Sequence, residues 1–163
     1  MLPTATIDNQ TSVLENIDYA SCCQSFHTQH STPQTAEQLM RSRYSAYVMG
    51  LIDYIVATTA PAQQQYLDKD AMSQWSKETD WQGLQVIRHI VQDKIHSTVE
   101  FKAYFINDDE LQAHHELSGF VKVDDKWYFL DPTTPCNLTM KQACLCGSGK
   151  KFKACCAKYL ING

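Results

Sequence analysis

Four cysteines crowd into a short polar stretch near the end of the chain. Cys144 and Cys146 are one residue apart, and the adjacent Cys155 and Cys156 follow after eight more residues. A unit this small needs a cross-link or a bound ion to hold a fold. Zinc in a structural role takes a closed tetrahedral shell of thiolate or imidazole ligands. The spacing therefore predicts one zinc ion held by these four side chains.

The residues between the two cysteine clusters support a metal site. Gly147-Ser148-Gly149 can take the tight, partly left-handed backbone that turns sharply beside a metal, and Phe152 can cap the small unit with an apolar ring. Five lysines and no acidic residue follow position 140: Lys141, Lys150, Lys151, Lys153 and Lys158. A zinc centre with four thiolates carries a charge of about minus two, which these cations would offset.

Other fates for these cysteines remain open at this point. Four reduced, unligated thiols or a disulfide would give the same composition, although adjacent cysteines such as Cys155 and Cys156 make a poor disulfide by geometry. Iron or an iron-sulfur cluster also suits soft thiolates, but cluster-binding sequences usually space their cysteines singly. The pattern favours zinc over these alternatives.

The cysteines also stand in a recognisable sequence. They are part of the run Cys144-x-Cys146-Gly147-Ser148-Gly149-Lys150-Lys151-Phe152-Lys153-x-Cys155-Cys156, which resembles the SEC-C zinc motif, named for its place at the C-terminus of the bacterial preprotein translocase ATPase. Upstream, similarity to the YchJ-like family of small bacterial proteins is carried by Leu39-Met40-Arg41-Ser42-Arg43-Tyr44-Ser45-Ala46-Tyr47-Val48 and Trp127-Tyr128-Phe129-Leu130-Asp131. The resemblance covers most of the chain. It implies an α+β protein with an NTF2-like (cystatin-like) cone of curved antiparallel sheet packed on helices, plus a small C-terminal zinc knuckle, and it implies no particular reaction.

A second pair of adjacent cysteines, Cys22 and Cys23, lies near the start of the chain. YchJ-like proteins typically carry another SEC-C-like unit there, and this pair stands where its closing cysteines would be. Counting back by the C-terminal spacing places the opening pair at Thr11 and Val13, and neither residue is a good zinc ligand. We therefore expect an N-terminal arm over residues 1–34 with a degenerate remnant of the motif.

Two histidines follow this pair closely enough to rebuild a site. His27 or His30 could complete a metal shell with the two cysteines. The favoured interpretation is that Cys22 and Cys23 are small buried hydrophobic residues and that both histidines are exposed to solvent. The remaining thiol, Cys136, lies in a turn-rich linker and is expected to be inert.

Length and charge agree with one domain and an appendage. The chain has 163 residues, of which 44% are hydrophobic and 20% charged, and this composition is globular. The overall charge is −4 and the segment from Lys141 onward contributes +5, so residues 1–140 carry −9. This asymmetry argues against a protein that binds nucleic acid over its whole surface. No apolar run approaches the ~20 residues of a membrane span, and no secretory signal is visible, so we expect a cytoplasmic protein with reduced thiols.

Helical patterns come first along the chain. A short helix is expected from Val13 to Cys23. A long one should begin at Thr35, where Thr35 and Gln38 have capping-box spacing, continue through Ile55 and end before Pro61. A further helix or a pair of turns is expected over residues 65–78, burying Leu67, Met72 and Trp75.

Strand patterns follow the helices. Alternation of apolar and polar residues predicts strands over 84–91, 97–106, 113–123 and 126–130, separated by turns rich in Asp and Asn. Helices followed by a strand meander are typical of an α+β fold. We assign residues 35–135 to the NTF2-like domain and 140–163 to the SEC-C motif.

Polar residues inside these apolar segments are candidates for a pocket in the cone. An NTF2-like cone has an open mouth, where enzymes with this fold place an acid or base on an apolar wall. The candidates are Arg41, Arg43, His89, His115 and Glu116. Each also has a structural explanation: Arg41 and Arg43 would anchor the helix to the sheet through Glu116 or Asp131, and His89 would be a satisfied core or surface histidine.

No catalytic signature accompanies these candidates. The sequence has no nucleophile elbow, no His-Glu-x-x-His, no phosphate-binding glycine loop and no dinucleotide fingerprint. One functional class is therefore a zinc-binding adaptor whose basic face, with Lys150, Lys151 and Lys153, contacts an acidic protein, an anionic lipid or a nucleic acid. The other is a small-molecule-binding protein or enzyme that uses the cone. A hollow cone with a polar residue on its wall would favour the second class.

Overall fold

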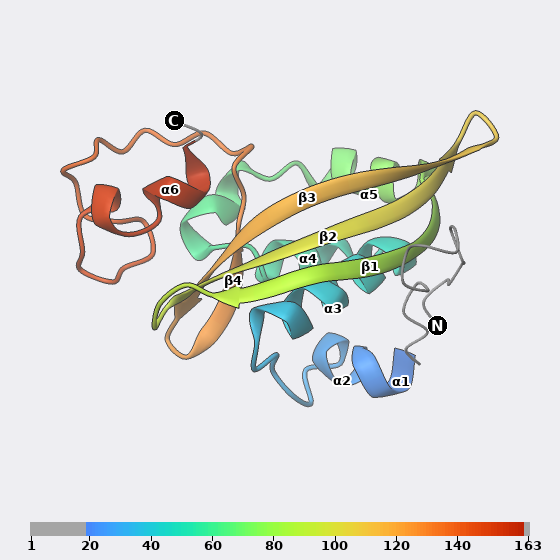
Figure 1. The fold of residues 1–163 in the computed structure, drawn as a ribbon, viewed down its shortest axis with the longest axis horizontal. Coiled ribbons are helices and arrows are strands. Elements are labelled where there is room, and N and C mark those ends of the chain that lie inside the picture. Colours follow the sequence, from blue (N-terminus) through green and yellow to red (C-terminus); the bar gives the residue numbers. More distant parts are fainter. Residues whose placement is uncertain (1–18, 162–163) are drawn as a thin grey trace.

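A four-stranded antiparallel sheet crosses the molecule, with strands in the order β1-β2-β3-β4 and helices along one face (Figure 1). The structure is a computed structural model and describes residues 19–161. The elements before the sheet are α1 (Tyr19–Cys22), α2 (Gln24–His27), α3 (Ala36–Met49), α4 (Ile52–Ala57), the 3₁₀ helix η1 (Pro61–Tyr66) and α5 (Lys69–Glu78). The strands are β1 (Asp80–Val91), β2 (His96–Asn107), β3 (Glu110–Val123) and β4 (Lys126–Leu130), and η2 (Phe152–Ala154) and α6 (Ala157–Leu160) follow them. The predicted α+β order is confirmed.

The longest helix, α3, begins as predicted but ends earlier. The Thr35 hydroxyl accepts a hydrogen bond from the Gln38 backbone N–H at 3.1 Å, which caps the first turn. The expected continuation to Ile55 is wrong, because Gly50 adopts a left-handed conformation with φ of 72° and stops the helix. A separate short helix, α4, then carries Ile55 into the core.

The segment after Pro61 forms two elements, and the second, α5, covers most of the helix expected over residues 65–78. Residues Pro61–Tyr66 form a 3₁₀ helix, and α5 begins after Asp68, whose side chain accepts a hydrogen bond from the Ala71 N–H. The expected burial of Trp75 is wrong, because this side chain is 48% exposed. Its ring packs edge-on against Trp81, with 5.1 Å between ring centroids. The period of the pattern identifies a helix but not how much of its apolar face the sheet covers.

The first three strands are longer than the sequence pattern predicts, β4 has the predicted bounds, and the sheet is curved. Register shifts in the pairing of β1 with β2 fall between Trp81 and Gly83 and between Val86 and Arg88. Such bulges increase the local twist and bend of a strand. The β2–β3 and β3–β4 hairpins turn at pairs of aspartates with positive φ angles, residues 108–109 and 124–125, a conformation that Asp tolerates better than most residues. The curvature gives the sheet a concave face against α3.

The core consists of two clusters of buried residues. The first fills the space between α3 and the concave face of the sheet and includes Leu39, Val99 and Phe120. The second joins the tail, which we define as residues 140–163, to the end of the sheet, and it contains Val121 and Phe152 together with the four cysteines of the tail. The tail is therefore packed on the sheet through an apolar interface.

A glycine allows this close approach of tail and sheet. Gly119 on β3 lies directly beneath Tyr159 of α6, and a Cβ atom at position 119 would lie 2.8 Å from the Tyr159 Cβ. Only a residue without a side chain leaves room for the aromatic ring there.

Within residues 19–161, no helix has the length and apolar character to cross a membrane.

Candidate metal centre and cavity

The structure brings the four predicted cysteines of the tail together. The Sγ atoms of Cys144, Cys146, Cys155 and Cys156 all lie within 4.8 Å of one another, and all four side chains are buried. The loop between the clusters turns as expected, because Gly147 has a φ of 79°. The Cys144 backbone N–H donates to the Lys150 carbonyl at 2.8 Å, which closes the loop beside the sulfurs.

The burial and proximity of the sulfurs shift the pKa values of the cysteine thiols in opposite directions. A hydrogen bond from Cys156 lowers the pKa of Cys144 to about 5. Burial raises the pKa of Cys155 to about 11, and the hydrogen bond with Cys144 followed by burial raises the pKa of Cys156. Four buried thiols cannot all ionise without a positive charge between them. A soft divalent metal supplies that charge, so the donor set fits a metal of this type.

The lysines of the tail lie outside this cluster and face solvent. Lys150, Lys151 and Lys153, predicted to contact a partner, are all exposed. No ion pair joins any of them to an acidic residue within residues 19–161. The positive charge of the tail is thus open to solvent.

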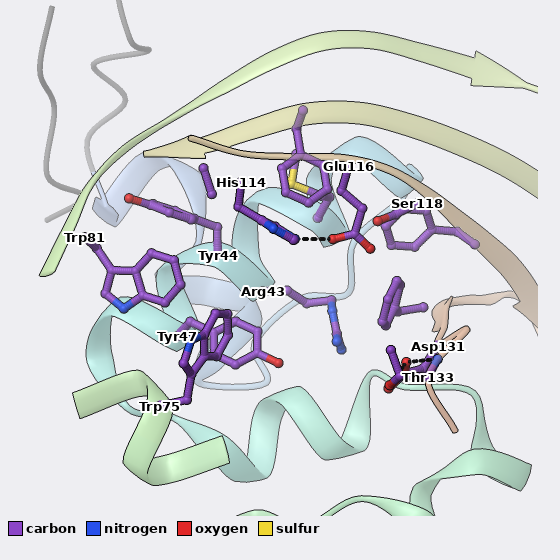
Figure 2. Close-up of a pocket in the computed structure, with 15 residues that line it drawn as sticks. Arg43, Tyr44, Tyr47, Trp75, Trp81, His114, Glu116, Ser118, Asp131 and Thr133 are labelled. Atoms are coloured by element: carbon purple, nitrogen blue, oxygen red, sulfur yellow. Dashed lines mark hydrogen bonds and ion pairs between the residues drawn. The ribbon is translucent and has the colours of Figure 1, made fainter. Parts of the chain in front are cut away.

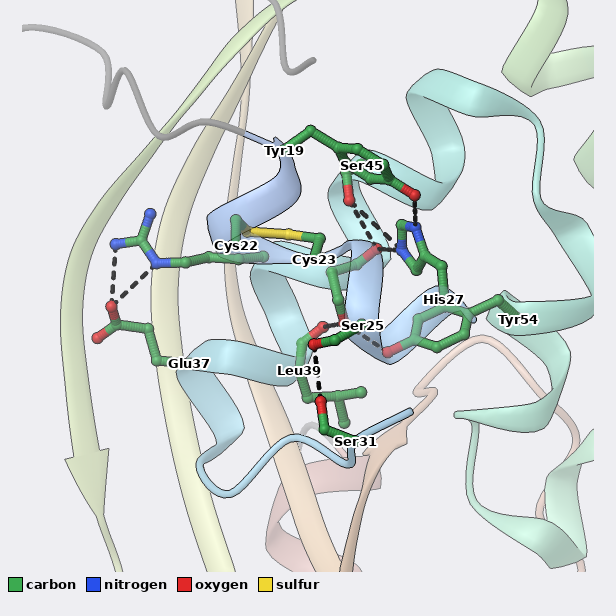
Figure 3. Close-up of a disulfide and its surroundings, with 12 residues drawn as sticks. Tyr19, Cys22, Cys23, Ser25, His27, Ser31, Glu37, Leu39, Ser45 and Tyr54 are labelled. Atoms are coloured by element: carbon green, nitrogen blue, oxygen red, sulfur yellow. Dashed lines mark hydrogen bonds and ion pairs between the residues drawn. A yellow bond between two sulfur atoms is a disulfide. The ribbon is translucent and has the colours of Figure 1, made fainter. Parts of the chain in front are cut away.

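The N-terminal pair has a different environment (Figure 3). Cys22 and Cys23 form a disulfide, and Cys23 is fully buried beneath α3. The expectation of two reduced thiols at this pair is wrong, although the expected burial of Cys23 is met. Thr11 and Val13 lie outside the described residues. Among residues 19–161, the four cysteines of the tail are the only group of three or more metal-type donors close enough to share an ion.

The two histidines beside the N-terminal pair do not complete a site. His27 is half-buried, and its Nε2 lies 2.8 Å from the Ser42 carbonyl while Nδ1 lies 2.8 Å from the Tyr19 hydroxyl. Nε2 therefore donates and Nδ1 accepts, which leaves no free lone pair for a metal. The expected exposure of His27 is wrong for this reason, whereas His30 is exposed as expected.

A cavity of about 240 Å³ lies between the concave face of the sheet and the helices (Figure 2). Its wall is largely aromatic, with Tyr44, Tyr47, Trp75 and Trp81 gathered at one end. At the other side, the His114 Nε2 and a Glu116 carboxylate oxygen are 2.9 Å apart. The cone is therefore hollow.

Arg43 projects from α3 into this cavity and is only 7% exposed. Its Nη1 donates to the Ile55 carbonyl at 2.8 Å and to the Thr58 hydroxyl at 2.7 Å. The other two guanidinium nitrogens make no hydrogen bond within residues 19–161. Burial lowers the pKa of Arg43, and the nearby Asp131 carboxylate opposes that shift. The expected direct ion pair of Arg43 with Glu116 or Asp131 is wrong, because backbone and hydroxyl oxygens take its place.

The remaining pocket candidates do not line the cavity. Arg41 pairs with Glu37 one turn earlier on α3, with 2.9 Å between Nη2 and Oε2. His89 lies on β1, and its Nδ1 is 3.9 Å from a carboxylate oxygen of the same Glu37. His115 lies on the opposite face of the sheet, where its Nε2 is 2.7 Å from Glu100.

Two residues near these sites were missed by sequence reasoning. His114, and not His115, lines the cavity, and strand alternation already places it on one face with Glu116. His96 is buried against the cysteine cluster, with its Nε2 3.4 Å from the Cys156 Sγ. The only sequence signal for His96 is the Asp93-x-x-His96 spacing across a predicted turn.

Known proteins share both parts of the chain. A family model described as the middle NTF2-like domain of YchJ matches residues 35–132, and a model of the SEC-C motif matches residues 140–158. A UPF0225 protein of Actinobacillus succinogenes is 55% identical over 145 residues, which cover 88% of this chain and 94% of that protein. A UPF0225 protein of Haemophilus influenzae is 52% identical over 142 residues, covering 87% of this chain and 88% of the other.

Solved structures agree with the fold. The crystal structure of a SEC-C motif-containing protein from Psychrobacter arcticus has a TM-score of 0.88 at 48% identity and covers 97% of this chain and 96% of its own. The solution structure of a SEC-C motif-containing protein from Rhodopseudomonas palustris has a TM-score of 0.67 at 36% identity, covering 72% of this chain and 91% of that one. The motif and the cysteine cluster together suggest metal binding. The chain belongs to the YchJ-like family, with an NTF2-like middle domain followed by a SEC-C motif.

Proposed function

We propose that this protein binds one zinc ion per chain through Cys144, Cys146, Cys155 and Cys156, and that the metal orders a basic tail which binds an anionic partner. The observation that carries the proposal is the gathering of four buried sulfurs within 4.8 Å. Thiolates in a tetrahedral set favour zinc over harder cations such as magnesium or calcium. The proposal places the protein in the cytoplasm, where the four free cysteines of the tail, unlike the joined Cys22 and Cys23, would be available to metal.

The zinc in this proposal is structural and not catalytic. Four protein ligands close a tetrahedral shell and leave no position for a water molecule or a substrate. The sulfurs are also buried, so a reactant in solvent would not reach them. The metal would instead stabilise the loop and the short helices η2 and α6, whose other support is the apolar interface with the sheet.

Elemental analysis of protein purified without chelators tests the metal. We expect about one zinc per chain, and iron or other metals well below that level. Zinc should be lost on denaturation with a chelator and recovered on refolding with zinc. A purified chain that holds no zinc, or that holds iron in place of zinc, would contradict the proposal.

The charge distribution supports a role for the tail in binding anions. The metal-bound tail would carry about +3 next to a body of −9. A positive patch on a negative body steers an anionic partner to one side of the molecule. Contacts of this kind weaken as salt rises, because the Debye length is only about 8 Å at physiological ionic strength.

Heparin affinity chromatography provides a polyanion with which to test this part of the proposal. A variant with Lys150→Gln, Lys151→Gln and Lys153→Gln should elute at lower salt than the wild type. The matched control replaces three exposed lysines of the body, Lys77, Lys94 and Lys126, with Gln and removes the same charge. Equal elution of the two variants would show that the tail has no special role.

A second candidate function uses the cavity, and the buried Arg43 favours it. Two guanidinium nitrogens without hydrogen-bond partners in residues 19–161 line an aromatic cavity of about 240 Å³. A small molecule with an apolar ring and a hydrogen-bond acceptor would satisfy both features, since the ring can stack on Tyr47 or Trp75 while the acceptor faces Arg43.

Thermal-shift screening with small aromatic acids and amides tests the cavity. A ligand should raise the melting temperature of the wild type, and less so that of a Tyr47→Ala variant, which removes part of the stacking wall. His115→Ala serves as the control, because His115 lies on the other face of the sheet. A shift that is the same in all three proteins would place the ligand outside the cavity.

A further inference from the structure

The cysteine cluster has a polar neighbour that comes from the sheet and not from the tail. His96, the first residue of β2, is 1% exposed. Its Nε2 lies 3.4 Å from the Sγ of Cys156 and 3.7 Å from the Sγ of Cys155. A buried imidazole in contact with two sulfurs of a four-cysteine cluster requires a partner for its nitrogen, and those sulfurs are the partners at hand.

The ring of His96 is fixed on its other sides. Its Nδ1 lies 2.9 Å from both carboxylate oxygens of Asp93, and because a carboxylate only accepts, Nδ1 carries a proton. Asp93 also accepts the Ile95 N–H at 2.9 Å. Burial acts to raise the pKa of Asp93, but the hydrogen bonds from Ile95 and His96 outweigh it and lower that pKa. The Tyr159 ring of α6 stacks on the imidazole at 4.9 Å between centroids.

On the basis of the zinc site proposed above, we propose that Asp93 and His96 form the outer part of the metal centre. In this arrangement His96 carries a proton on both ring nitrogens, so that Nδ1 donates to the Asp93 carboxylate, which orients the ring, and Nε2 donates to the Cys156 thiolate. His96 is then a positioning residue and not a ligand, because four thiolates already complete the tetrahedral shell. The carboxylate, imidazole and sulfur follow the arrangement in which outer groups orient and tune metal ligands.

This arrangement gives the sheet a direct part in holding the metal. A hydrogen bond to a thiolate withdraws negative charge from the sulfur and balances the excess charge of a four-thiolate centre. The bond joins residues 60 positions apart, at the β1–β2 hairpin and at the start of α6. The tail is therefore held on the sheet by a polar contact at the metal as well as by the apolar interface at Gly119.

Release of zinc to a colorimetric chelator tests the proposal on the full, zinc-loaded chain. His96→Phe keeps an aromatic ring that can stack on Tyr159 but removes both nitrogens. We expect it to release zinc about 10- to 100-fold faster than the wild type. Asp93→Asn should act in the same direction with a smaller effect. His115→Phe, a matched change on the outer face of the sheet, should release zinc at the wild-type rate.

Cobalt substitution provides a readout that a purely structural role of His96 would not change. The thiolate-to-cobalt charge-transfer bands should move to longer wavelength in His96→Phe, because a sulfur without the hydrogen bond holds its electrons less tightly. The ligand-field bands should indicate four sulfurs in both proteins. Asp93→Asn should show a smaller shift of these bands in the same direction. The Asp93 side chain is 43% exposed, so we expect this variant to fold.

Two results would overturn the inference. The first is that the wild type binds zinc, and that His96→Phe and Asp93→Asn both release zinc at the wild-type rate and show the wild-type cobalt spectrum. The second is a cobalt spectrum of the wild type with a nitrogen ligand that His96→Phe removes, which would make His96 a ligand. A wild-type chain that holds no metal would instead contradict the proposed zinc function and is distinguished from both.

Discussion

The chain contains two pairs of adjacent cysteines, and their surroundings give them different chemistry. Cys155 and Cys156 stand beside two further cysteines and the imidazole of His96. Cys22 and Cys23 are joined to each other, and no cluster of metal-type donors surrounds them within residues 19–161. Both pairs are partly or fully buried. Burial and the dipeptide itself therefore do not distinguish them.

The supply of further donors does distinguish them. At the C-terminal pair, a glycine loop returns the chain so that the opening and closing cysteines meet. At the N-terminal pair, the nearest candidate, His27, already uses both ring nitrogens with Tyr19 and Ser42. A metal site needs its third and fourth donors as much as its first two. Four predictions test this comparison.

The largest effect is expected from breaking the C-terminal pair. Cys156→Ser should lower bound zinc from about one per chain to near zero, because apparent binding energies of about 10–16 kcal/mol at structural zinc sites depend on the full ligand set. The melting temperature should also fall, since the tail shares an apolar cluster with the sheet. The control is Cys136→Ser, a partly buried free cysteine outside the four. Zinc retained in full by Cys156→Ser would contradict the assignment.

A smaller effect should follow from separating the tail from the sheet without touching a cysteine. In Gly119→Ala the new Cβ would lie 2.8 Å from the Tyr159 Cβ, so we expect a loss of about 1–3 kcal/mol in the free energy of unfolding. The same change in a Tyr159→Gly background should cost less, because only a residue without a Cβ at position 159 relieves the clash. Denaturant unfolding of the four proteins measures this coupling. Equal costs in both backgrounds would show that the tail does not pack there.

A still smaller effect is expected at the N-terminal pair. A chain with Cys22→Ala and Cys23→Ala should keep one zinc and lose about 1 kcal/mol of stability, mainly from lost packing at the buried Cys23. A cross-link between neighbours closes almost no loop, so it restricts the unfolded chain little. Elemental analysis and denaturant unfolding check both parts. A second zinc in the wild type that this variant loses would overturn the comparison.

Most of the fold could be predicted from the sequence, because the signals involved are local. Alternation predicts the strands, and the Thr35 cap predicts the start of α3. The break at Gly50 could not be predicted, since apolar periodicity continues across it. The exposure of Trp75 could not be predicted either, because the extent of the sheet that faces a helix depends on its bulges and not on the helix.

The candidate sites also contain residues that local sequence signals predict and residues that they do not. The four cysteines could be predicted because their spacing is local to one loop, and the structure gathers them. His96 could not, because its contact with Cys156 depends on the docking of the tail. His114 was available to sequence reasoning, since strand alternation places it on one face with Glu116, its partner two residues along β3. A one-residue difference in alternation decides whether His114 or His115 faces the cavity.

The smallest effect concerns His27, whose hydrogen bonds exclude it from a metal site. Burial lowers the pKa of His27 from its ordinary value of 6.5. The hydrogen bond to the Ser42 carbonyl opposes part of this shift. The unfolded chain therefore binds this proton more tightly. The stability that His27 contributes is complete above about pH 6.5 and is lost as the pH falls through the lower folded pKa.

Unfolding free energies measured between pH 7 and pH 5 should then fall less steeply in His27→Gln than in the wild type. The slopes of unfolding free energy against pH of the two proteins can differ by at most about 1.4 kcal/mol per pH unit, the value for one proton. His30→Gln, a change at the exposed neighbour, is the control and should follow the wild type. An unchanged slope in His27→Gln would mean that His27 is charged and solvated in the folded chain. The hydrogen bonds of His27 to Tyr19 and Ser42 would then not be what keeps a metal from the N-terminal pair.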